Sequence, residues 1–245
     1  MPHRDPARAA RSAEDLRSLD AGIVDCFACP RLVAWRELKA NEKVARFRGE
    51  TYWGRPVPGF GDPAARILIV GLAPAANGGN RTGRVFTGDA SGDFLWPVLH
   101  AVGLASQPTS VRAGDGLTLN GGRIAAAVRC APPDNKPTPD EMARCQPYIV
   151  RELELLAGLR VIVALGAIAW NTTLRALDAA GTPVPRPRPR FAHGAETSID
   201  RYLLLGTYHP SQQNTNTGRL TEPMLEAVLR RAVALVASSS GQARL

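Results

Sequence analysis

The chain has 245 residues, of which 44% are apolar, enough for one domain with a substantial core. No apolar run approaches the roughly 20 residues that span a bilayer, and residues 1–20 lack the apolar segment of a signal peptide, so we expect a cytoplasmic protein with no membrane partner. The net charge of +8, from 30 Lys and Arg against 22 Asp and Glu, is compatible with a nucleic-acid partner, although an arginine-rich proteome would explain the same balance.

The sequence divides into three parts by composition. Residues 1–20 are polar and rich in alanine and arginine, and we expect a flexible segment there, or a helix around Ala9–Leu19. Residues 21–237 form one predicted domain. Residues 238–245 are small and polar and predict a flexible tail.

Four cysteines are the next feature, and two of them, Cys26 and Cys29, are three residues apart. Two thiols at this spacing can reach one metal. A cytosolic location argues against disulfides, and no strand precedes Cys26 as a thioredoxin-like redox pair would require. Together with Cys130 and Cys145 they predict a four-thiolate site, for which zinc and an iron–sulfur cluster both fit. Four unrelated buried thiols are the simpler alternative.

Four short apolar runs predict strands that are buried on both faces, because they lack alternation and are rich in leucine or β-branched residues. These runs are Ala65–Gly71, Arg123–Val128, Leu159–Gly166 and Tyr202–Tyr208. Helices are predicted at Arg31–Val44, Asp93–Val102, Thr138–Ala157, Ile168–Ala179 and from Thr221 to about Val236. The alternation of strands and helices predicts an α/β fold, a parallel sheet with helices on both faces.

Two polar loops follow predicted strands at the same edge of this sheet. The first begins at Gly71 and is dense in glycine, asparagine and arginine, with Phe86 as its aromatic and Asp89 as its carboxylate. The second contains His209, followed by hydroxyl and amide side chains that can read bases and hold phosphates. Ligands of α/β proteins bind at the carboxyl ends of the strands, so we expect a binding site where these loops meet.

These loops also carry a family resemblance. The segment from Gly71 to Asp89 resembles the first motif of the UdgB-type, family-5 uracil-DNA glycosylases. His209-Pro210-Ser211, with Asn214 and Thr217-Gly218-Arg219, resembles their second motif. The four cysteines stand where the iron–sulfur branches of the superfamily carry their cluster ligands. The similarity extends from about Cys26 to Arg230, nearly the whole chain.

The resemblance implies a three-layer α/β/α sandwich around a four-stranded parallel sheet. It implies a structural [4Fe–4S] cluster on Cys26, Cys29, Cys130 and Cys145. It also implies an enzyme, expected to be a monomer, that removes uracil and other deaminated bases from single- or double-stranded DNA and starts base excision repair.

Roles for individual residues follow from the resemblance and from the chemistry. Phe86 is expected to stack on a base flipped out of the DNA. His209 is expected to donate a hydrogen bond to the base, which gains negative charge, and Asp89 to position water and stabilise the cationic sugar, with Asn80 as a helper. Residues 80–84 would contact DNA or order the loop. The remaining expected substrate-binding residues are Gly71, Ala73, Asn135, Asn214 and Ser211.

Two departures from better-known members of the superfamily affect the predicted activity. Leu72 and Ala73 replace an acidic or amide side chain, which places the activation of water on Asp89. Ala125–Ala127 stands where uracil-specific relatives carry a base-reading asparagine, so we expect relaxed specificity that includes hypoxanthine and ethenocytosine. Neither motif contains a lysine, so no imine with the sugar is expected and the strand stays intact.

Two other functions remain as alternatives. The missing acid in the first motif is compatible with a non-catalytic protein that binds damaged or single-stranded DNA on the same fold. The glycine-rich loop alone suggests a nucleotide-phosphate hydrolase, but the chain lacks a Gly-Lys-Ser/Thr signature and the acidic cluster expected for magnesium.

Overall fold

The computed structural model describes the backbone of residues 2–241, and its central layer is a six-stranded sheet in the order β1-β3-β2-β4-β6-β5. The strands are Phe60–Gly61 (β1), Ile67–Gly71 (β2), Gly122–Ala126 (β3), Val161–Leu165 (β4), Glu196–Ile199 (β5) and Tyr202–Thr207 (β6). The inner strands β3, β2, β4 and β6 are parallel, which confirms the four predicted strands. β1 and β5 add antiparallel edges.

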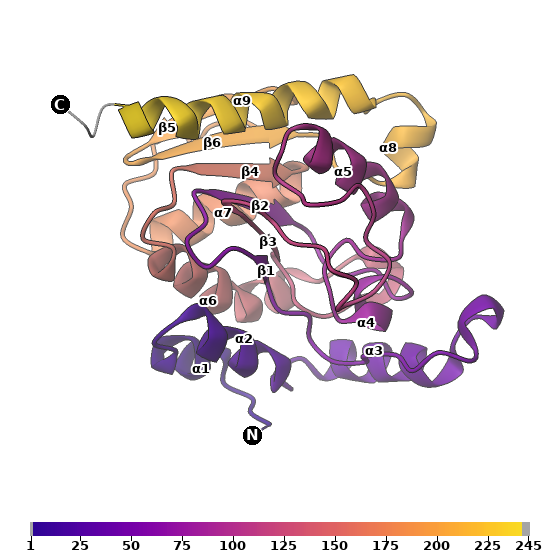
Figure 1. Cartoon of the computed structure of the whole chain (residues 1–245). Helices are drawn as coiled ribbons and strands as arrows, with labels where there is room; N and C mark the ends of the chain where they lie inside the picture. Colours follow the sequence, from indigo (N-terminus) through magenta and orange to yellow (C-terminus); the bar gives the residue numbers. More distant parts are fainter. Residues whose placement is uncertain (1, 242–245) are drawn as a thin grey trace.

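Helices cover both faces of this sheet and give the predicted three-layer α/β/α sandwich (Figure 1). The helices are Pro6–Ser12 (α1), Leu16–Val24 (α2), Pro30–Glu42 (α3), Gly79–Thr82 (α4), Ala90–Ala101 (α5), Pro139–Leu155 (α6), Ala167–Ala179 (α7), Gln212–Asn216 (α8) and Glu222–Gly241 (α9). α6 and α7 pack on one face, with α1 and α2 behind α6, while α5 and α9 pack on the other. In the described residues, no helix is long and apolar enough to cross a membrane.

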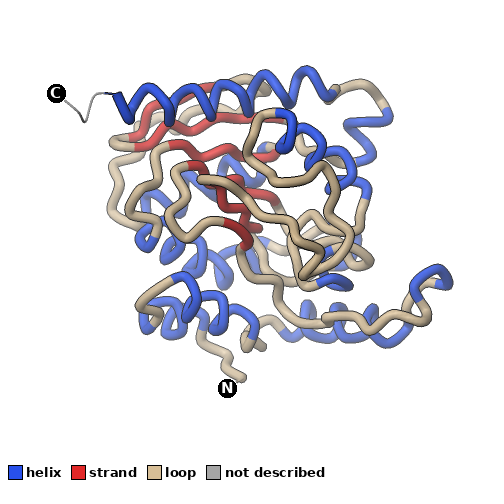
Figure 2. Tube along the Cα trace, in the orientation of Figure 1, coloured by secondary structure: helices blue, strands red, loops and turns tan. Residues whose placement is uncertain are grey.

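The inner strands are apolar throughout because their side chains enter two separate cores. In β2, Leu68 and Val70 pack with α6 and α7, whereas Ile67 and Ile69 pack with α5 and α9. Every residue of β2, β3 and β4 is buried. The strands therefore lie between the two helical layers, as Figure 2 shows, and only their ends reach solvent and the loops.

Most of residues 1–20 are helical and not a flexible segment, but two helices, α1 and α2, replace the single helix expected around Ala9–Leu19. Asp15 and Ser18 make a capping box at the start of α2. Leu19 and Ile23, one helical turn apart, are fully buried in the core that α6 shares. The predicted tail also begins too early, because α9 continues to Gly241; residues 242–245 lie outside the described part of the chain.

The two edge strands were not predicted because their sequences carry little signal. β1 has only two residues, and it pairs through Phe60 with Ile124 of β3. β5 is Glu-Thr-Ser-Ile, in which only Ile199 is buried, so it lacks the apolar run of the inner strands. Both strands cover the edges of the sheet that β3 and β6 would otherwise expose to solvent.

Candidate active site

A cavity of about 530 Å³ lies at the carboxyl ends of the parallel strands, where the two polar loops meet. Gly71 ends β2, Ala126 ends β3, and His209 follows β6 by two residues. Phe86 and Asp89 line the same cavity from the first loop. The structure therefore brings together the aromatic, the carboxylate and the histidine that the sequence singled out, although 120 residues separate Asp89 from His209.

Phe86 lies directly against the backbone at Gly71. A Cβ added at Gly71 would lie 2.7 Å from the Phe86 ring, so only glycine permits this approach. The ring also faces His209, with centroids 5.9 Å apart and planes inclined at 37°. The indole N–H of Trp96 in α5 donates a hydrogen bond to the Phe86 carbonyl and fixes the backbone of this residue. The ring thus forms a fixed wall of the cavity.

Asp89 is the N-cap residue of α5, and its Oδ1 accepts a hydrogen bond of 3.0 Å from the Gly92 amide. Its Oδ2 lies so close to Gly78 that no side chain could replace that glycine without a shift. Burial raises the pKa of the Asp89 carboxyl, and the hydrogen bond from Gly92 opposes the increase only in part. A carboxylate held in a partly dry cavity is a stronger base than one in water.

The backbone carbonyl of His209 is hydrogen-bonded, whereas its imidazole ring is available to a ligand. Its carbonyl accepts hydrogen bonds of 2.9 Å from Asn214 Nδ2 and 2.8 Å from the Ser211 amide. In the described residues, neither ring nitrogen has a hydrogen-bond partner. Burial lowers the pKa of His209 to about 4, so the ring is neutral at physiological pH. A neutral ring carries one N–H group that can donate to a ligand.

Two of the predicted site residues do not line this cavity. Asn80 is fully buried, and its Nδ2 donates a hydrogen bond of 3.1 Å to the Arg36 carbonyl in α3. Its position does not support the predicted helper role in catalysis and indicates a structural link between α3 and α4. Asn214 holds the His209 carbonyl and contacts a neighbouring hollow, so it acts on the cavity only through His209.

Other predicted residues do line the cavity, together with some that were not predicted. Ala73, Asn135 and Ser211 are on its wall. So are Asp134 and Gln213, which sequence reasoning missed. Asp134 and Asn135 both have left-handed backbones, with φ of 54° and 56°, in the turn after β3. The position of Asp134 in a turn directly after a buried strand could have predicted that it lines the cavity.

The four cysteines line one small space between α3, α6 and the loop after β3, which confirms that they come together. Burial raises the pKa of Cys130 to about 12, and it also raises those of Cys29 and Cys145. Arg36 Nη1 donates to Cys130 Sγ at 3.1 Å. Without a bound metal, these buried thiols would stay protonated.

The surroundings of the thiols indicate what they can hold. In the described residues, no group of three or more His, Cys, Asp or Glu side chains is arranged to hold a single metal ion. Two nitrogens of Arg36 and two of Arg129 are buried there without a hydrogen-bond partner among the described residues. The four thiols lie beside two buried guanidinium groups, whose positive charge would suit an anionic metal centre.

Comparisons with known proteins identify relatives of this chain. The family model described as the uracil DNA glycosylase superfamily matches residues 58–232. A type-5 uracil-DNA glycosylase of Mycobacterium tuberculosis is 53% identical over 225 residues, which cover 91% of this chain and 82% of that protein. The type-5 enzyme of Thermus thermophilus is 55% identical over 212 residues, 86% of this chain and 93% of that protein. A type-4 enzyme of Archaeoglobus fulgidus is 30% identical over 177 residues, 72% of this chain and 79% of that protein.

Proposed function

The chain belongs to the uracil-DNA glycosylase superfamily, with type-5 enzymes among its relatives, and from this we propose that it hydrolyses the N-glycosidic bond of uracil in DNA and leaves an abasic site. The observation that carries the proposal is the cavity that Phe86, Asp89 and His209 share. We also propose that the enzyme acts as a monomer in the cytoplasm.

The base must leave the DNA stack to reach these residues. The proposal places the flipped base against the Phe86 ring. His209 then donates its N–H group to a base oxygen, where negative charge develops as the bond to the sugar breaks. The lowered pKa of His209 supports a neutral donor, since a proton on the second nitrogen would cost free energy in this buried position.

Asp89 acts on the other product of the bond cleavage, the cationic sugar. Its carboxylate stabilises that charge and orients a water molecule for attack. The raised pKa of Asp89 supports a role as a base. No lysine lines the cavity within the described residues, so the proposal is simple hydrolysis, without an imine and without cleavage of the strand.

Relaxed specificity is part of the proposal. Ala73, in the turn after β2, and Ala126, the last residue of β3, line the wall of the cavity. Their methyl groups cannot form hydrogen bonds with the edge of a base. The cavity volume of about 530 Å³ leaves room for a purine such as hypoxanthine, and for ethenocytosine. We therefore expect selection to depend on how easily a base leaves the stack.

We further propose a structural [4Fe–4S] cluster on Cys26, Cys29, Cys130 and Cys145. Such a cluster would tie the segment before α3 to α6 and to the loop after β3. Ala73 of the cavity wall packs against the same group of side chains, so the cluster would also support the active site. Purified protein should be brown, with iron and acid-labile sulfide; a colourless anaerobic preparation with one zinc per chain would overturn this assignment.

A glycosylase assay across deaminated bases, in each duplex context and in single strands, tests the activity. Abasic sites should accumulate beyond one per enzyme with uracil, and Asp89→Asn and His209→Ala should each slow excision. If neither substitution changes the rate, these residues have no part in the mechanism. Binding without turnover would favour the alternative, a non-catalytic protein that recognises damaged or single-stranded DNA.

A further inference from the structure

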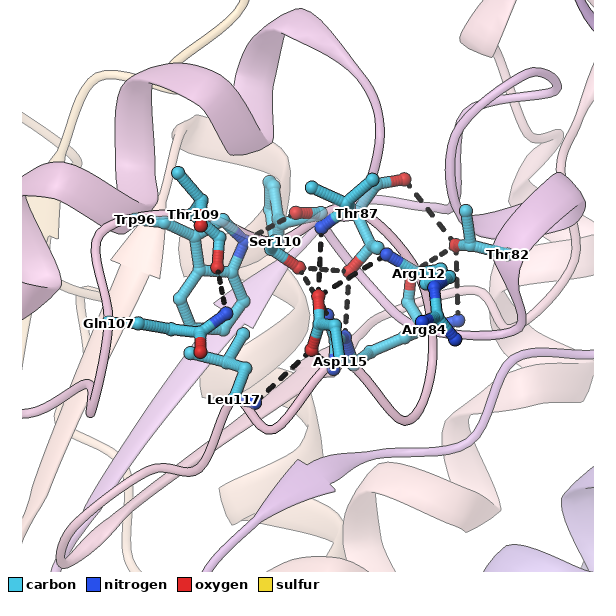
Figure 3. A network of polar contacts seen from close by, with 12 residues as sticks. Thr82, Arg84, Thr87, Trp96, Gln107, Thr109, Ser110, Arg112, Asp115 and Leu117 are labelled. Atoms are coloured by element: carbon cyan, nitrogen blue, oxygen red, sulfur yellow. Dashed lines mark hydrogen bonds and ion pairs between the residues drawn. The ribbon is translucent and has the colours of Figure 1, made fainter.

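A buried polar network joins the loop that carries Phe86 and Asp89 to the connection between α5 and β3. Figure 3 shows Arg84, Ser110 and Asp115 of this network. At its centre, Arg84 of this loop pairs with Asp115, which lies in the long connection between α5 and β3. The guanidinium and carboxylate groups form two hydrogen bonds, of 2.9 and 2.7 Å. The side chains are only 5% and 10% exposed, so water and salt screen this pair weakly.

Asp115 organises its own connection as well. Its Oδ2 accepts from the Val111 amide at 2.9 Å, and its Oδ1 accepts from the Leu117 amide at 3.2 Å. Burial alone would raise the pKa of Asp115, but the hydrogen bonds from Arg84 and from these amides outweigh it and hold that pKa well below its ordinary value. The carboxylate is therefore ionised at neutral pH.

Arg84 extends the network to both sides of Phe86. Its Nε donates to Thr87 Oγ1 at 3.0 Å, and its Nη2 donates to Ser110 Oγ at 2.8 Å. The two hydroxyl oxygens are 2.6 Å apart. The Ser110 carbonyl accepts from the Gly88 amide at 3.0 Å. The connection between α5 and β3 thus clamps the turn at residues 84–88.

This turn needs such a clamp. Phe86 has a φ of 50° and Gly88 a φ of 68°, and the left-handed region is unfavourable for phenylalanine unless its surroundings enforce it. Asp89 follows immediately. A turn released from the network would relax, and both the aromatic ring and the carboxylate would move.

We propose that Asp115 is a positioning residue for base excision, which acts through Arg84 and the turn on Phe86 and Asp89. The inference rests on the proposed glycosylase function. Its loss should slow bond cleavage because Phe86 and Asp89 would be displaced. DNA binding should stay almost unchanged, because Asp115 does not line the cavity and affinity for DNA depends mainly on phosphate contacts.

Single-turnover excision and DNA binding, measured on a uracil-containing duplex, test this for Asp115→Asn. The cleavage rate should fall about 10- to 100-fold, as expected for a displacement of reacting groups by about 1 Å, while Kd changes less than about threefold. A matched control is Asp20→Asn, which removes a carboxylate from Arg123 at the amino-terminal end of β3. The control should keep its cleavage rate and its Kd.

Equal cleavage rates for Asp115→Asn and the wild type would overturn the proposal, as would a loss confined to Kd. If Asp115→Asn does not fold, Ser110→Ala removes one hydroxyl from the network and should slow cleavage more weakly, with the same unchanged Kd. A wild-type protein that excises no uracil would refute the proposed function instead, so the two failures can be told apart.

Discussion

Replacement of Asp89 should separate its structural role from its chemical one. The carboxylate caps α5 through a hydrogen bond of 3.0 Å to the Gly92 amide, and it lies in a site that raises its pKa. Asparagine caps a helix about as well as aspartate, whereas alanine forfeits about 1 kcal/mol. We therefore expect Asp89→Asn to abolish most excision and still to melt at or above the wild-type temperature.

The pH dependence has a definite sign. Since the folded-state pKa of Asp89 lies above the ordinary value of 3.8, the ionised carboxylate destabilises the folded state at neutral pH. The stability gained in Asp89→Asn should thus be present at pH 7 and vanish as the pH falls below about 3.8. Asp89→Ala should melt about 2–4 °C below Asp89→Asn, the shift expected for about 1 kcal/mol in a domain of this size.

Calorimetry across pH and single-turnover excision measure both effects. Excision should fall at least about 100-fold in both variants, the usual contribution of a positioned general base. Asp93→Asn is the matched control, because it removes an exposed carboxylate from the same first turn of α5 and should leave excision intact. If Asp89→Asn melts as low as Asp89→Ala, the side chain does not cap α5. If Asp89→Asn melts below the wild type at pH 7, burial does not destabilise the ionised carboxylate, and either result refutes the reasoning.

Three further predictions concern the wall, the core and the cluster. Gly71→Ala should reduce excision at least about tenfold, because the new Cβ would lie 2.7 Å from the Phe86 ring; wild-type rates on a uracil duplex would contradict this. Glu152→Gln should lower the free energy of unfolding, measured in urea, by about 3–5 kcal/mol, because this fully buried carboxylate pairs with Arg123 and Arg129. A loss under about 1 kcal/mol would show that these two ion pairs do not stabilise the fold. Cys130→Ser should lower the iron and acid-labile sulfide per chain, and unchanged values would remove this residue from the ligand set.

The motifs and the periodicity of the chain determined much of this protein in advance. Inner strands such as β2 are recognisable because burial on both faces forces a continuous apolar run. Phe86, Asp89 and His209 could be assigned to one site because carboxyl ends of parallel strands share an edge. These inferences need only local sequence and a general property of parallel sheets.

Tertiary structure decided what each polar side chain of the first loop does. Asn80 and Arg84 belong to the same motif as Phe86, but they are buried and point to α3 and to the connection after α5. Their partners, Arg36 and Asp115, are 44 and 31 residues away in sequence. No periodicity encodes such a pairing, since it depends on where distant loops cross.

The burial of the N-terminal helices also could not be predicted from local sequence. Residues 1–20 are polar in composition, and the burial of Leu19 in α2 depends on the apolar surface that α1 and α6 provide. The sequence thus determined which two loops meet at the cavity. The folded chain determined which of them meet a substrate and which only hold the others in place, because burial and partners are properties of the assembled layers.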